Sequence, residues 1–297
     1  MGADSPLGVP APADLVADAA AIATRLGLRV DEPVVLKDSL NLLVWLRPSP
    51  VVARIHARTA LVRSPEAAAD SLALASYLAD AGLPVSPPAD DVDPGPHVGA
   101  TGRPMTFWRR LDVDETSPDP AEVGRTLRGL HEAMASYEGP LRHVGPVEEI
   151  GRLAEILKAQ RPDETARILA VLDALELPDL PAQPLHGDAH LGNVVVAAGR
   201  LRWLDWEESW RGPIAWDLAC LVHRQATFGE GAEEIGRAVA GYGAYDAEAV
   251  DAWMPAYALW AAAWGFLGDL DGLDWWIEGA RRRLDWAERA VGGGAGA

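Results

Sequence analysis

The sequence predicts an α+β fold with a small, β-rich N-terminal lobe and a larger, mostly helical C-terminal lobe. Two observations support this prediction. Short runs of β-branched and apolar residues gather in the first part of the chain, whereas helical spacing of apolar residues prevails after Pro118. In addition, 49% of the 297 residues are hydrophobic, which is enough to bury a large core. We therefore expect an N-terminal lobe over 1–111 and a C-terminal lobe over 112–297.

The elements of the N-terminal lobe follow from apolar spacing and from turn residues. The predicted elements are a helix over 12–26, a polar turn over 37–40, strands over 41–47 and 51–56, a helix over 64–81, an extended segment over 84–96 and a strand over 105–111. Pro48-Ser49-Pro50 joins the first two strands into an antiparallel hairpin. Ser64, Pro65 and Gly82 stand where the second helix needs its N-cap, its first residue and its stop.

In the C-terminal lobe, prolines separate the predicted helices. Helices are expected over 121–136, 147–160 and 164–175, followed by a hairpin with strands over 193–197 and 201–206, and then by helices to the end of the chain. In the last helical region, Trp253, Trp260 and Trp264 fall on one face of a helix. Such a stripe is typical of a packed core.

Charge and composition exclude several classes of protein. The 26 Lys and Arg residues against 44 Asp and Glu residues give a net charge of −18, so no nucleic acid is expected as a partner. The same charge either steers a cationic small molecule to the site or serves solubility. The longest apolar stretches, such as 257–267, are shorter than the roughly 18–20 residues of a membrane span, so no membrane segment is expected.

The N-terminus and the cysteine content point to the cytoplasm. The first residues show neither a basic region followed by an apolar run nor a myristoylation signal, so no export or anchoring is expected. Cys220 is the only cysteine and cannot form an internal disulfide. Its apolar neighbours predict a buried thiol.

One polar stretch of the C-terminal lobe carries the predicted chemistry. Asp188 and Asn193 lie in Leu185-His186-Gly187-Asp188-Ala189-His190-Leu191-Gly192-Asn193, and Asp205 follows the hairpin in Leu204-Asp205-Trp206-Glu207. Phosphoryl transfer needs an aligned acceptor hydroxyl and metal ions that neutralise the phosphates. One carboxamide and one carboxylate supply hard oxygen ligands for Mg²⁺. The spacing of these three residues therefore matches a phosphoryl-transfer site.

Three segments together resemble the signature of the aminoglycoside-phosphotransferase and choline-kinase family, whose members have a bilobal, protein-kinase-like fold. They are His-Gly-Asp-x-His-x-x-Asn at 186–193, Leu-Asp-Trp-Glu at 204–207 and Gly-Pro-Ile-Ala-Trp-Asp-Leu-Ala at 212–219. Leu130-His131-Glu132 is similar to a further segment of that family. The resemblance implies a kinase that transfers the γ-phosphate of ATP or GTP to a hydroxyl of a small molecule and depends on Mg²⁺.

The resemblance also implies a role for each matching residue. Asp188 would orient the acceptor hydroxyl and partly deprotonate it. Asn193 and Asp205 would bind Mg²⁺. His186 and Asp217 would support the catalytic loop structurally.

Two further residues near this motif have an open role. His190 either packs against the next strand or takes part in catalysis. Glu207 either supports the metal site or is an exposed acidic residue after the strand.

The N-terminal lobe should bind the nucleotide, and here the chain departs from the kinase pattern. In place of a Gly-rich loop it has Ser39 and Asn41, which either donate hydrogen bonds to phosphate or belong to a plain turn. In place of the strand lysine it has Arg54, whose guanidinium can bind phosphate oxygens. Asp70 or Glu66 would pair with this arginine in the empty enzyme, unless the arginine lies on the outer face of its strand.

The adenine site is expected along the strand that ends at Phe107-Trp108-Arg109-Arg110. Trp108 either contacts the base or belongs to the core. The acceptor site is expected near the C-terminal helices. There an acidic patch of Asp269, Asp271, Asp274 and Glu278 beside Trp275 and Trp276 either suits an amino sugar or a quaternary amine, or is a solvated surface.

The acceptor itself cannot be predicted from the sequence. Candidates are an aminoglycoside or another antibiotic, an amino sugar, choline or ethanolamine, homoserine, or a short metabolite with a hydroxyl. Two other functions compete with the kinase. In kinases a helix glutamate pairs with the strand lysine, and in this chain Ser71 stands at its expected place. Arg54 and the absence of that glutamate would suit a catalytically weak, nucleotide-binding module of the same fold. A metallohydrolase would use His186, Asp188 and His190 as ligands of a transition metal, but it leaves Asn193 and the 204–207 segment without a role.

Overall fold

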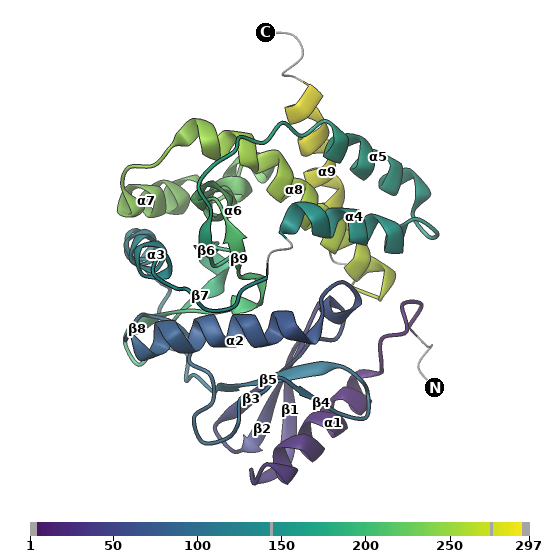
Figure 1. Cartoon of the computed structure of the whole chain (residues 1–297), viewed down its shortest axis with the longest axis vertical. Helices are drawn as coiled ribbons and strands as arrows, with labels where there is room; N and C mark the ends of the chain where they lie inside the picture. Colours follow the sequence, from purple (N-terminus) through teal and green to yellow (C-terminus); the bar gives the residue numbers. More distant parts are fainter. Residues whose placement is uncertain (1–4, 143–144, 274–275, 293–297) are drawn as a thin grey trace. The chain divides into compact units, whose positions relative to one another are not determined.

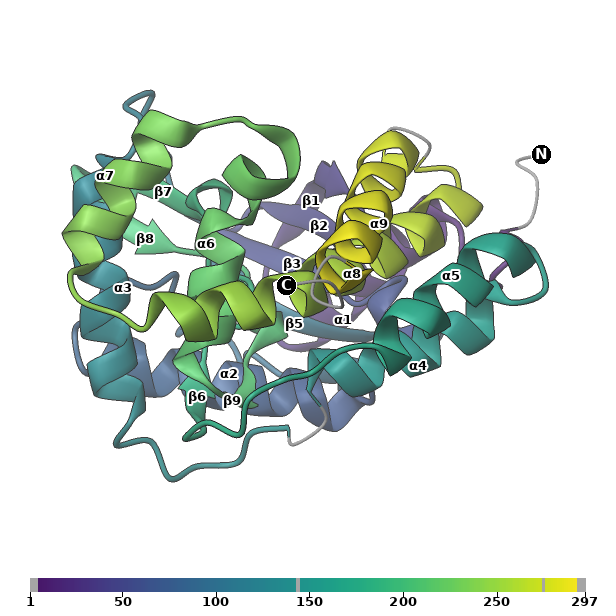
Figure 2. The ribbon, with the colours of Figure 1, turned by 90° about the horizontal axis from the view of Figure 1, so that it is seen from above.

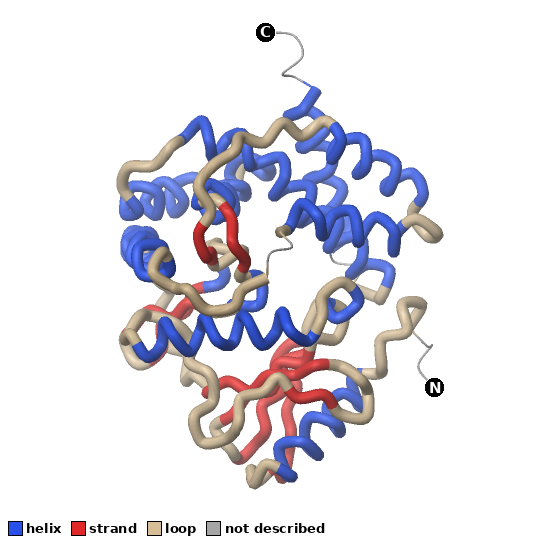
Figure 3. The backbone as a smooth tube through the Cα atoms, in the orientation of Figure 1, coloured by secondary structure: helices blue, strands red, loops and turns tan. Residues whose placement is uncertain are grey.

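The computed structural model describes residues 5–142, 145–273 and 276–292. The chain divides into two compact units, 1–113 and 114–297. Most strands lie in the first unit and most helices in the second (Figure 1 and Figure 3). The predicted α+β class is therefore confirmed.

The first unit is built on an antiparallel five-stranded sheet with the order β1-β2-β3-β5-β4. Its strands are β1 (Val30–Asp38), β2 (Leu42–Pro48), β3 (Val51–Ile55), β4 (His97–Val98) and β5 (Pro104–Arg109). The predicted hairpin is formed by β2 and β3. The sequence did not predict β4 or β1. The turn expected over 37–40 was wrong in part, because Lys37 and Asp38 end β1.

Strand β1 contains Pro33, pairs only with β2 and exposes many of its side chains. It therefore lacks the apolar alternation of an inner strand.

One face of this sheet packs against helix α1 (Pro12–Arg25) and forms the core of the unit. The core includes Leu15, Ala19 and Ile22 of the helix and Leu42, Val44, Ala53, Ile55 and Phe107 of the sheet. Side chains alternate along a strand, so Arg54, Thr106 and Trp108 stand on the opposite face. That face therefore carries two of the residues expected to bind the nucleotide.

Helix α2 (Pro65–Asp80) packs against β5. It begins after Ser64 with Pro65 in its first turn, as predicted. Gly82 lies just beyond its end with a φ of +75°, a conformation that suits glycine.

Seven helices form most of the described part of the second unit. They are α3 (Pro120–Met134), α4 (Pro146–Leu157), α5 (Pro162–Asp173), α6 (Ile214–Phe228), α7 (Ala232–Tyr242), α8 (Ala247–Leu270) and α9 (Ile277–Gly292). Proline at the start of α3, α4 and α5 explains why the sequence predicted their beginnings well. Helices α8 and α9 lie side by side, α3 packs against α7, and α4 and α6 pack against α8 (Figure 2).

Two small antiparallel sheets stand among these helices. The predicted hairpin is β7 (Val194–Ala197) and β8 (Arg200–Trp203). The second pair, β6 (Gln183–Leu185) and β9 (Trp210–Gly212), was not predicted, because three residues are too few to show a period. Short 3₁₀ turns, η2 (Leu191–Asn193) and η3 (Trp206–Glu208), precede β7 and β9.

The long helix α8 forms the centre of the second core. The stripe of Trp253, Trp260 and Trp264 is buried, as predicted for a core face. The Cys220 thiol is buried as well. Within the described residues, no helix is both long and apolar enough to cross a membrane.

A buried carboxylate of α1 fixes a loop of the first unit. Asp18 accepts hydrogen bonds from the backbone N–H groups of Ala100 (3.0 Å) and Thr101 (2.9 Å) and from the Thr101 hydroxyl (2.6 Å). Burial raises the pKa of Asp18, but these hydrogen bonds outweigh burial and hold the pKa below its ordinary value. The interaction therefore stabilises the folded state fully at neutral pH and is lost as the pH falls through the lowered pKa.

We expect Asp18→Ala to lower the free energy of unfolding at pH 7 by about 1–3 kcal/mol, because three donors lose their buried acceptor. Asp14→Ala is the matched control, since Asp14 is exposed on the same helix and contributes at most about 1 kcal/mol through the helix dipole. Urea unfolding at pH 7 and pH 3 measures both variants. Equal losses at pH 7 would contradict the role of Asp18, and the difference should shrink at pH 3.

Candidate active site

Three donors converge on one buried carboxylate, that of Asp217 in the first turn of α6. One oxygen accepts from the backbone N–H of His186 (2.9 Å) and from Nε2 of His131 (3.0 Å). The other accepts from the N–H of Gly187 at 2.8 Å. The side chain is fully buried. Asp217 therefore anchors the beginning of the 186–193 loop to α6 and, through His131, to α3.

Gly187 is clamped on both sides. Its carbonyl accepts from the indole N–H of Trp216 at 2.7 Å, while its N–H donates to Asp217. Its φ is +89°, and a Cβ placed on it would lie 2.0 Å from the carbonyl oxygen of Glu208. That oxygen accepts from Arg142 Nη2 at 2.7 Å and is therefore held in place. Only glycine fits this position.

The His186 ring links the loop to the end of β8. Its Nε2 donates to the carbonyl of Leu204 at 2.8 Å, and its Nδ1 accepts from the N–H of Asp188 at 3.3 Å. Burial lowers the pKa of His186, and its effect exceeds that of the Asp217 and Asp188 charges, which act to raise the pKa. The ring is therefore neutral, as a ring that donates through Nε2 and accepts at Nδ1 must be. The histidine thus spans the short distance between Asp188 and the residue before Asp205.

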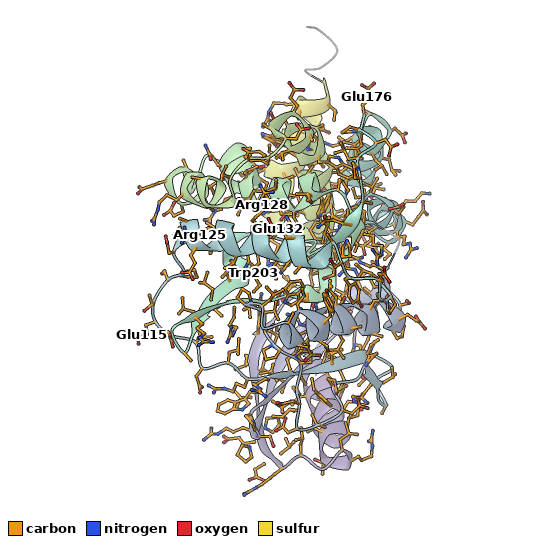
Figure 4. The ribbon with its side chains drawn as sticks, turned by 60° about the vertical axis from the view of Figure 1, so that its left-hand side comes forward. Glu115, Arg125, Arg128, Glu132, Glu176 and Trp203 are labelled. Atoms are coloured by element: carbon orange, nitrogen blue, oxygen red, sulfur yellow. The ribbon has the colours of Figure 1, made fainter. Side chains whose placement is uncertain are left out.

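Helix α3 also contacts this region, and Figure 4 labels Arg128 of α3 and Trp203 of β8. The Trp203 indole donates to the Thr126 hydroxyl at 3.0 Å. Arg128 donates through Nε to the carbonyl of Tyr242 at 3.1 Å, and its guanidinium lies 4.0 Å from the centre of the Tyr242 ring. The Tyr242 hydroxyl donates in turn to Nδ1 of His131 at 2.9 Å, which orients the ring that donates to Asp217.

The side chain of Asp188 is held by three donors. Oδ1 accepts from the Tyr257 hydroxyl at 3.0 Å. Oδ2 accepts from Asn193 Nδ2 at 3.0 Å and lies 3.3 Å from His190 Nε2. The Asn193 amide also donates to the carbonyl of Asp188 at 2.9 Å. The structure therefore brings Asp188 and Asn193 into direct contact, as their spacing predicts, and places His190 beside them.

Electrostatics keep this carboxylate ionised. Burial raises the pKa of Asp188, but the neighbouring His190, His186 and Tyr257 outweigh burial, so the pKa lies well below its usual range. His190 Nδ1 accepts from the N–H of Gly192 at 3.0 Å, so the proton of a neutral ring sits on Nε2 and faces Asp188. Burial and the Asp188 charge raise the pKa of Tyr257 well above its ordinary value, so its hydroxyl stays a donor.

Asn193 and Asp205 flank the open end of the β7–β8 hairpin. The N–H of Leu204 donates to the carbonyl of Asn193 at 2.8 Å and extends the strand pairing by one residue. Asp205 follows at once, with φ 59° and ψ 51°, a left-handed conformation that is unusual for a residue other than glycine. Non-glycine residues in this conformation cluster at functional sites.

The donor set at this point fits a hard cation. Because Asn193 uses its NH₂ group on Asp188, its amide oxygen can serve as a ligand, together with the carboxylate of Asp205. Within the described residues, no three His, Cys, Asp or Glu side chains are grouped so that they could hold a metal by themselves. His186 uses both ring nitrogens in the loop. These facts disfavour the transition-metal site of a metallohydrolase.

In the first unit, Arg54 and Trp108 share one face of the sheet. The Arg54 side chain is only 8% exposed, so it is not a solvated arginine on an outer face. Thr106 pairs with it across β3 and β5, and the Trp108 indole donates to the Thr106 hydroxyl at 2.8 Å. Burial, followed by the charges of Arg54 and Arg63, lowers the pKa of His56 to about 3, so this ring is neutral at pH 7.

Ser39 and Asn41 hold the loop after β1. The Ser39 hydroxyl donates to the carbonyl of Asn41 at 3.3 Å, and the Asn41 amide oxygen accepts from the Thr59 hydroxyl at 2.6 Å. Arg58, which the sequence analysis missed, is buried beside them and pairs with Asp38 at 2.8 Å. These side chains shape the loop, and their expected contact with phosphate stays a prediction.

Tyr257 is the main site residue that the sequence analysis missed. It lies four residues after Trp253 and three before Trp260, inside the stripe interpreted as core. Its hydroxyl, the one side-chain oxygen in a stripe of tryptophans, was the available signal. One member of the acidic patch expected near the acceptor, Asp269, is paired with Arg161. Two further members of that group, residues 274–275, lie outside the described residues.

Comparison with protein families gives one match. The sequence model of the phosphotransferase enzyme family matches residues 35–254, which is most of the chain. No curated protein matches the sequence.

Solved structures share the fold at low identity. A choline kinase from Streptococcus pneumoniae has a TM-score of 0.64 at 16% identity, over 92% of this chain and 98% of that chain. Amicoumacin kinase, in complex with AMP-PNP and Ca²⁺, has a TM-score of 0.64 at 15% identity, over 94% and 96%. An aminoglycoside phosphotransferase in complex with GDP and kanamycin has a TM-score of 0.59 at 14% identity, over 90% and 96%. The protein-kinase-like fold expected from the sequence is therefore confirmed.

We expect Gly187→Ala to lower the free energy of unfolding by at least about 3 kcal/mol, because its Cβ meets a fixed backbone oxygen. The matched control is Gly199→Ala in the β7–β8 turn. Gly199 also has a positive φ, +70°, but a Cβ there meets nothing within 4 Å. It should cost only about 1–2 kcal/mol of conformational strain. Thermal unfolding compares the two, and equal losses would show that the close contact does not matter.

Proposed function

The chain belongs to the phosphotransferase enzyme family, and we propose that it transfers the γ-phosphate of ATP or GTP to a hydroxyl group of a small molecule. The bond from the γ-phosphorus to the leaving nucleotide oxygen breaks as the bond to the acceptor oxygen forms, and the products are a phosphate ester and a nucleoside diphosphate.

A single observation carries this proposal. The ionised carboxylate of Asp188 contacts Asn193, and Asn193 is joined by a backbone hydrogen bond to the residue before Asp205. This arrangement supports a site in which Asp188 would accept a hydrogen bond from an alcohol, with Asn193 and Asp205 as oxygen ligands for a cation. Phosphoryl transfer requires this combination, because it depends on alignment and on neutralising phosphate charge.

Asp188 would act mainly by orienting the acceptor hydroxyl. Its lowered pKa means that the carboxylate is ionised at neutral pH and can accept the hydroxyl hydrogen bond at once. It would take the proton as the new phosphorus–oxygen bond forms and then release it to solvent. Tyr257 and His190 would keep the carboxylate in position for this contact.

Asn193 and Asp205 would hold Mg²⁺ through the amide oxygen and the carboxylate. The bound ion would neutralise the charge of the nucleotide phosphates. Two protein ligands are few, so the remaining positions would be filled by phosphate oxygens and water.

The nucleotide would be bound by residues of the first unit. Arg54 would contact phosphate oxygens, with Ser39 and Asn41 shaping the loop and Trp108 near the base. Relatives of the same fold have been solved with AMP-PNP and with GDP, which supports a purine nucleotide without deciding between ATP and GTP.

The catalytically weak binding module predicts a different result. Such a protein would bind nucleotide without any Mg²⁺-dependent turnover. A release assay for the nucleoside diphosphate, with ATP and GTP each tested, separates the two functions.

We expect Asp188→Asn to retain nucleotide affinity while phosphate transfer falls by about 10²–10⁴. Asp205→Ala should abolish Mg²⁺-dependent turnover, because the cation loses its charged ligand. Steady-state kinetics and nucleotide titration measure both effects. Near-normal turnover in Asp205→Ala would refute the site, and loss of nucleotide binding in Asp188→Asn would make that residue structural.

We expect Arg54→Ala to raise the nucleotide KM by about tenfold or more and to lower turnover, because a charge-assisted contact to phosphate is lost. Arg54→Lys should retain a substantial fraction of activity. Arg47→Ala is the control, since Arg47 is an exposed arginine on the neighbouring strand and should change either constant by less than about twofold. If Arg54→Ala behaves like that control, Arg54 does not bind the nucleotide.

A further inference from the structure

Three buried polar side-chain atoms of α6 and α9 form no hydrogen bond with any residue that the structure describes. They are His223 Nε2 and Thr227 Oγ1 of α6 and Nε of Arg283 in α9. The two α6 residues are four apart and share one helix face, and α6 packs against α9. Buried polar atoms are nearly always hydrogen-bonded, so a group of three without partners indicates a missing ligand or ordered water.

Arg283 is the charged member of this group. Within the described residues no carboxylate lies within ion-pair distance of it, whereas Arg224 pairs with Glu230 at 2.8 Å. Its guanidinium lies 4.8 Å from the centre of the Phe228 ring. Gly279 leaves space for it, because a Cβ there would lie 3.0 Å from Arg283 Nη1. A largely buried guanidinium without an anionic partner is costly.

His223 offers a hydrogen-bond acceptor, whereas the Arg283 guanidinium offers donors. Its Nδ1 donates to the carbonyl of Cys220 at 2.9 Å, so Nε2 of the neutral ring carries a free lone pair. Burial, with the charge of Arg283 among the smaller causes, lowers the pKa of His223 to about 4, so the ring is neutral at pH 7. The side chain is only 6% exposed. This nitrogen can accept a hydrogen bond from a ligand O–H or N–H.

The group adjoins Asp188. The ring of Tyr257 lies 4.5 Å from the His223 ring, centre to centre, and its hydroxyl donates to Asp188 at 3.0 Å. Phe228 connects Arg283 to this group, because its ring centre lies 4.8 Å from the Arg283 guanidinium and 6.5 Å from the centre of the His223 ring. A ligand held by Arg283 and His223 would thus lie next to the tyrosine that donates to Asp188.

Two carboxylates of the second unit are already neutralised by arginines. Asp269 pairs with Arg161, and Glu149 pairs with Arg142 and accepts from the Trp260 indole. Arg283, in contrast, forms no ion pair with any of the described carboxylates.

We propose that the acceptor is a small hydroxy acid whose anionic group binds Arg283 and whose neighbouring hydroxyl or amino group donates to His223. This assignment rests on the proposed function, because it places the reacting hydroxyl at Asp188. The anion would satisfy the buried guanidinium, and the donor would satisfy the free imidazole nitrogen. The bonds made and broken are those of the phosphoryl transfer described above.

Four probes test the two recognition elements separately. L-Serine carries a carboxylate and an amine, D-glycerate a carboxylate and a second hydroxyl, ethanolamine an amine alone, and glycerol neither charge. We expect serine and glycerate to raise the thermal unfolding temperature of the full chain and to be phosphorylated in preference to ethanolamine and glycerol. Arg283→Met should remove this preference and weaken acid binding by about 10- to 100-fold, while the nucleotide KM stays unchanged.

Two variants control the result. Arg283→Lys should retain part of the preference for acids. Arg281→Met removes an exposed arginine of the same helix and should leave both binding and turnover as in the wild type. Circular dichroism of Arg283→Met checks that the protein is folded.

The outcomes separate this inference from the proposed function. Nucleotide hydrolysis without an acceptor, and its loss in Asp205→Ala, test the phosphotransferase alone. If that hydrolysis is present but ethanolamine is preferred over serine and glycerate, the inference is wrong. It is also wrong if Arg283→Met keeps the preference for acids, or if neither acid binds, which would mean that water fills the group.

Discussion

The structure around the site depends on one buried charge, the carboxylate of Asp217. An ionised group without partners in the interior costs several kcal/mol, and here three hydrogen bonds and the N-terminus of α6 offset that cost. Two of the donors are consecutive backbone N–H groups, at residues 186 and 187. A carboxylate that binds two successive amides fixes the direction of the chain, so the course of the 186–193 loop is decided before its functional side chains are considered.

Order spreads from this anchor along short contacts. The His186 side chain donates a hydrogen bond to the residue after β8, and the Trp216 indole donates one to the carbonyl of Gly187. The Tyr257 hydroxyl then joins α8 to Asp188 from the opposite side. The C-terminal helices are therefore part of the site and not only its cover. Holding a carboxylate by fixed donors removes the need to reorganise it during a reaction.

The features that could be predicted from the sequence are those that local residues determine. Asp188 and Asn193 lie in one loop and Asp205 follows the next hairpin, so the contact of Asp188 with Asn193 follows from local geometry. Helices that begin with proline were predicted for the same reason. The protein-kinase-like fold followed from the family resemblance.

Other features depend on tertiary contacts that leave little trace in the sequence. Tyr257 reaches Asp188 across 69 residues and lies in a tryptophan stripe that reads as core. Strand β1 escaped prediction because an edge strand with exposed side chains has no hydrophobic period. Ion pairs such as Arg161 with Asp269 join residues more than a hundred positions apart, and this one neutralises a single member of the apparent acidic patch.

The left-handed backbone at Asp205 affects which substitutions this position tolerates. A residue with a side chain pays about 1 kcal/mol or more to adopt that conformation, and glycine adopts it freely. Replacement by glycine would therefore relieve local strain at the same step that removes the carboxylate. If Asp205 binds the cation as proposed, the backbone of this residue and its side chain place opposite demands on the same position.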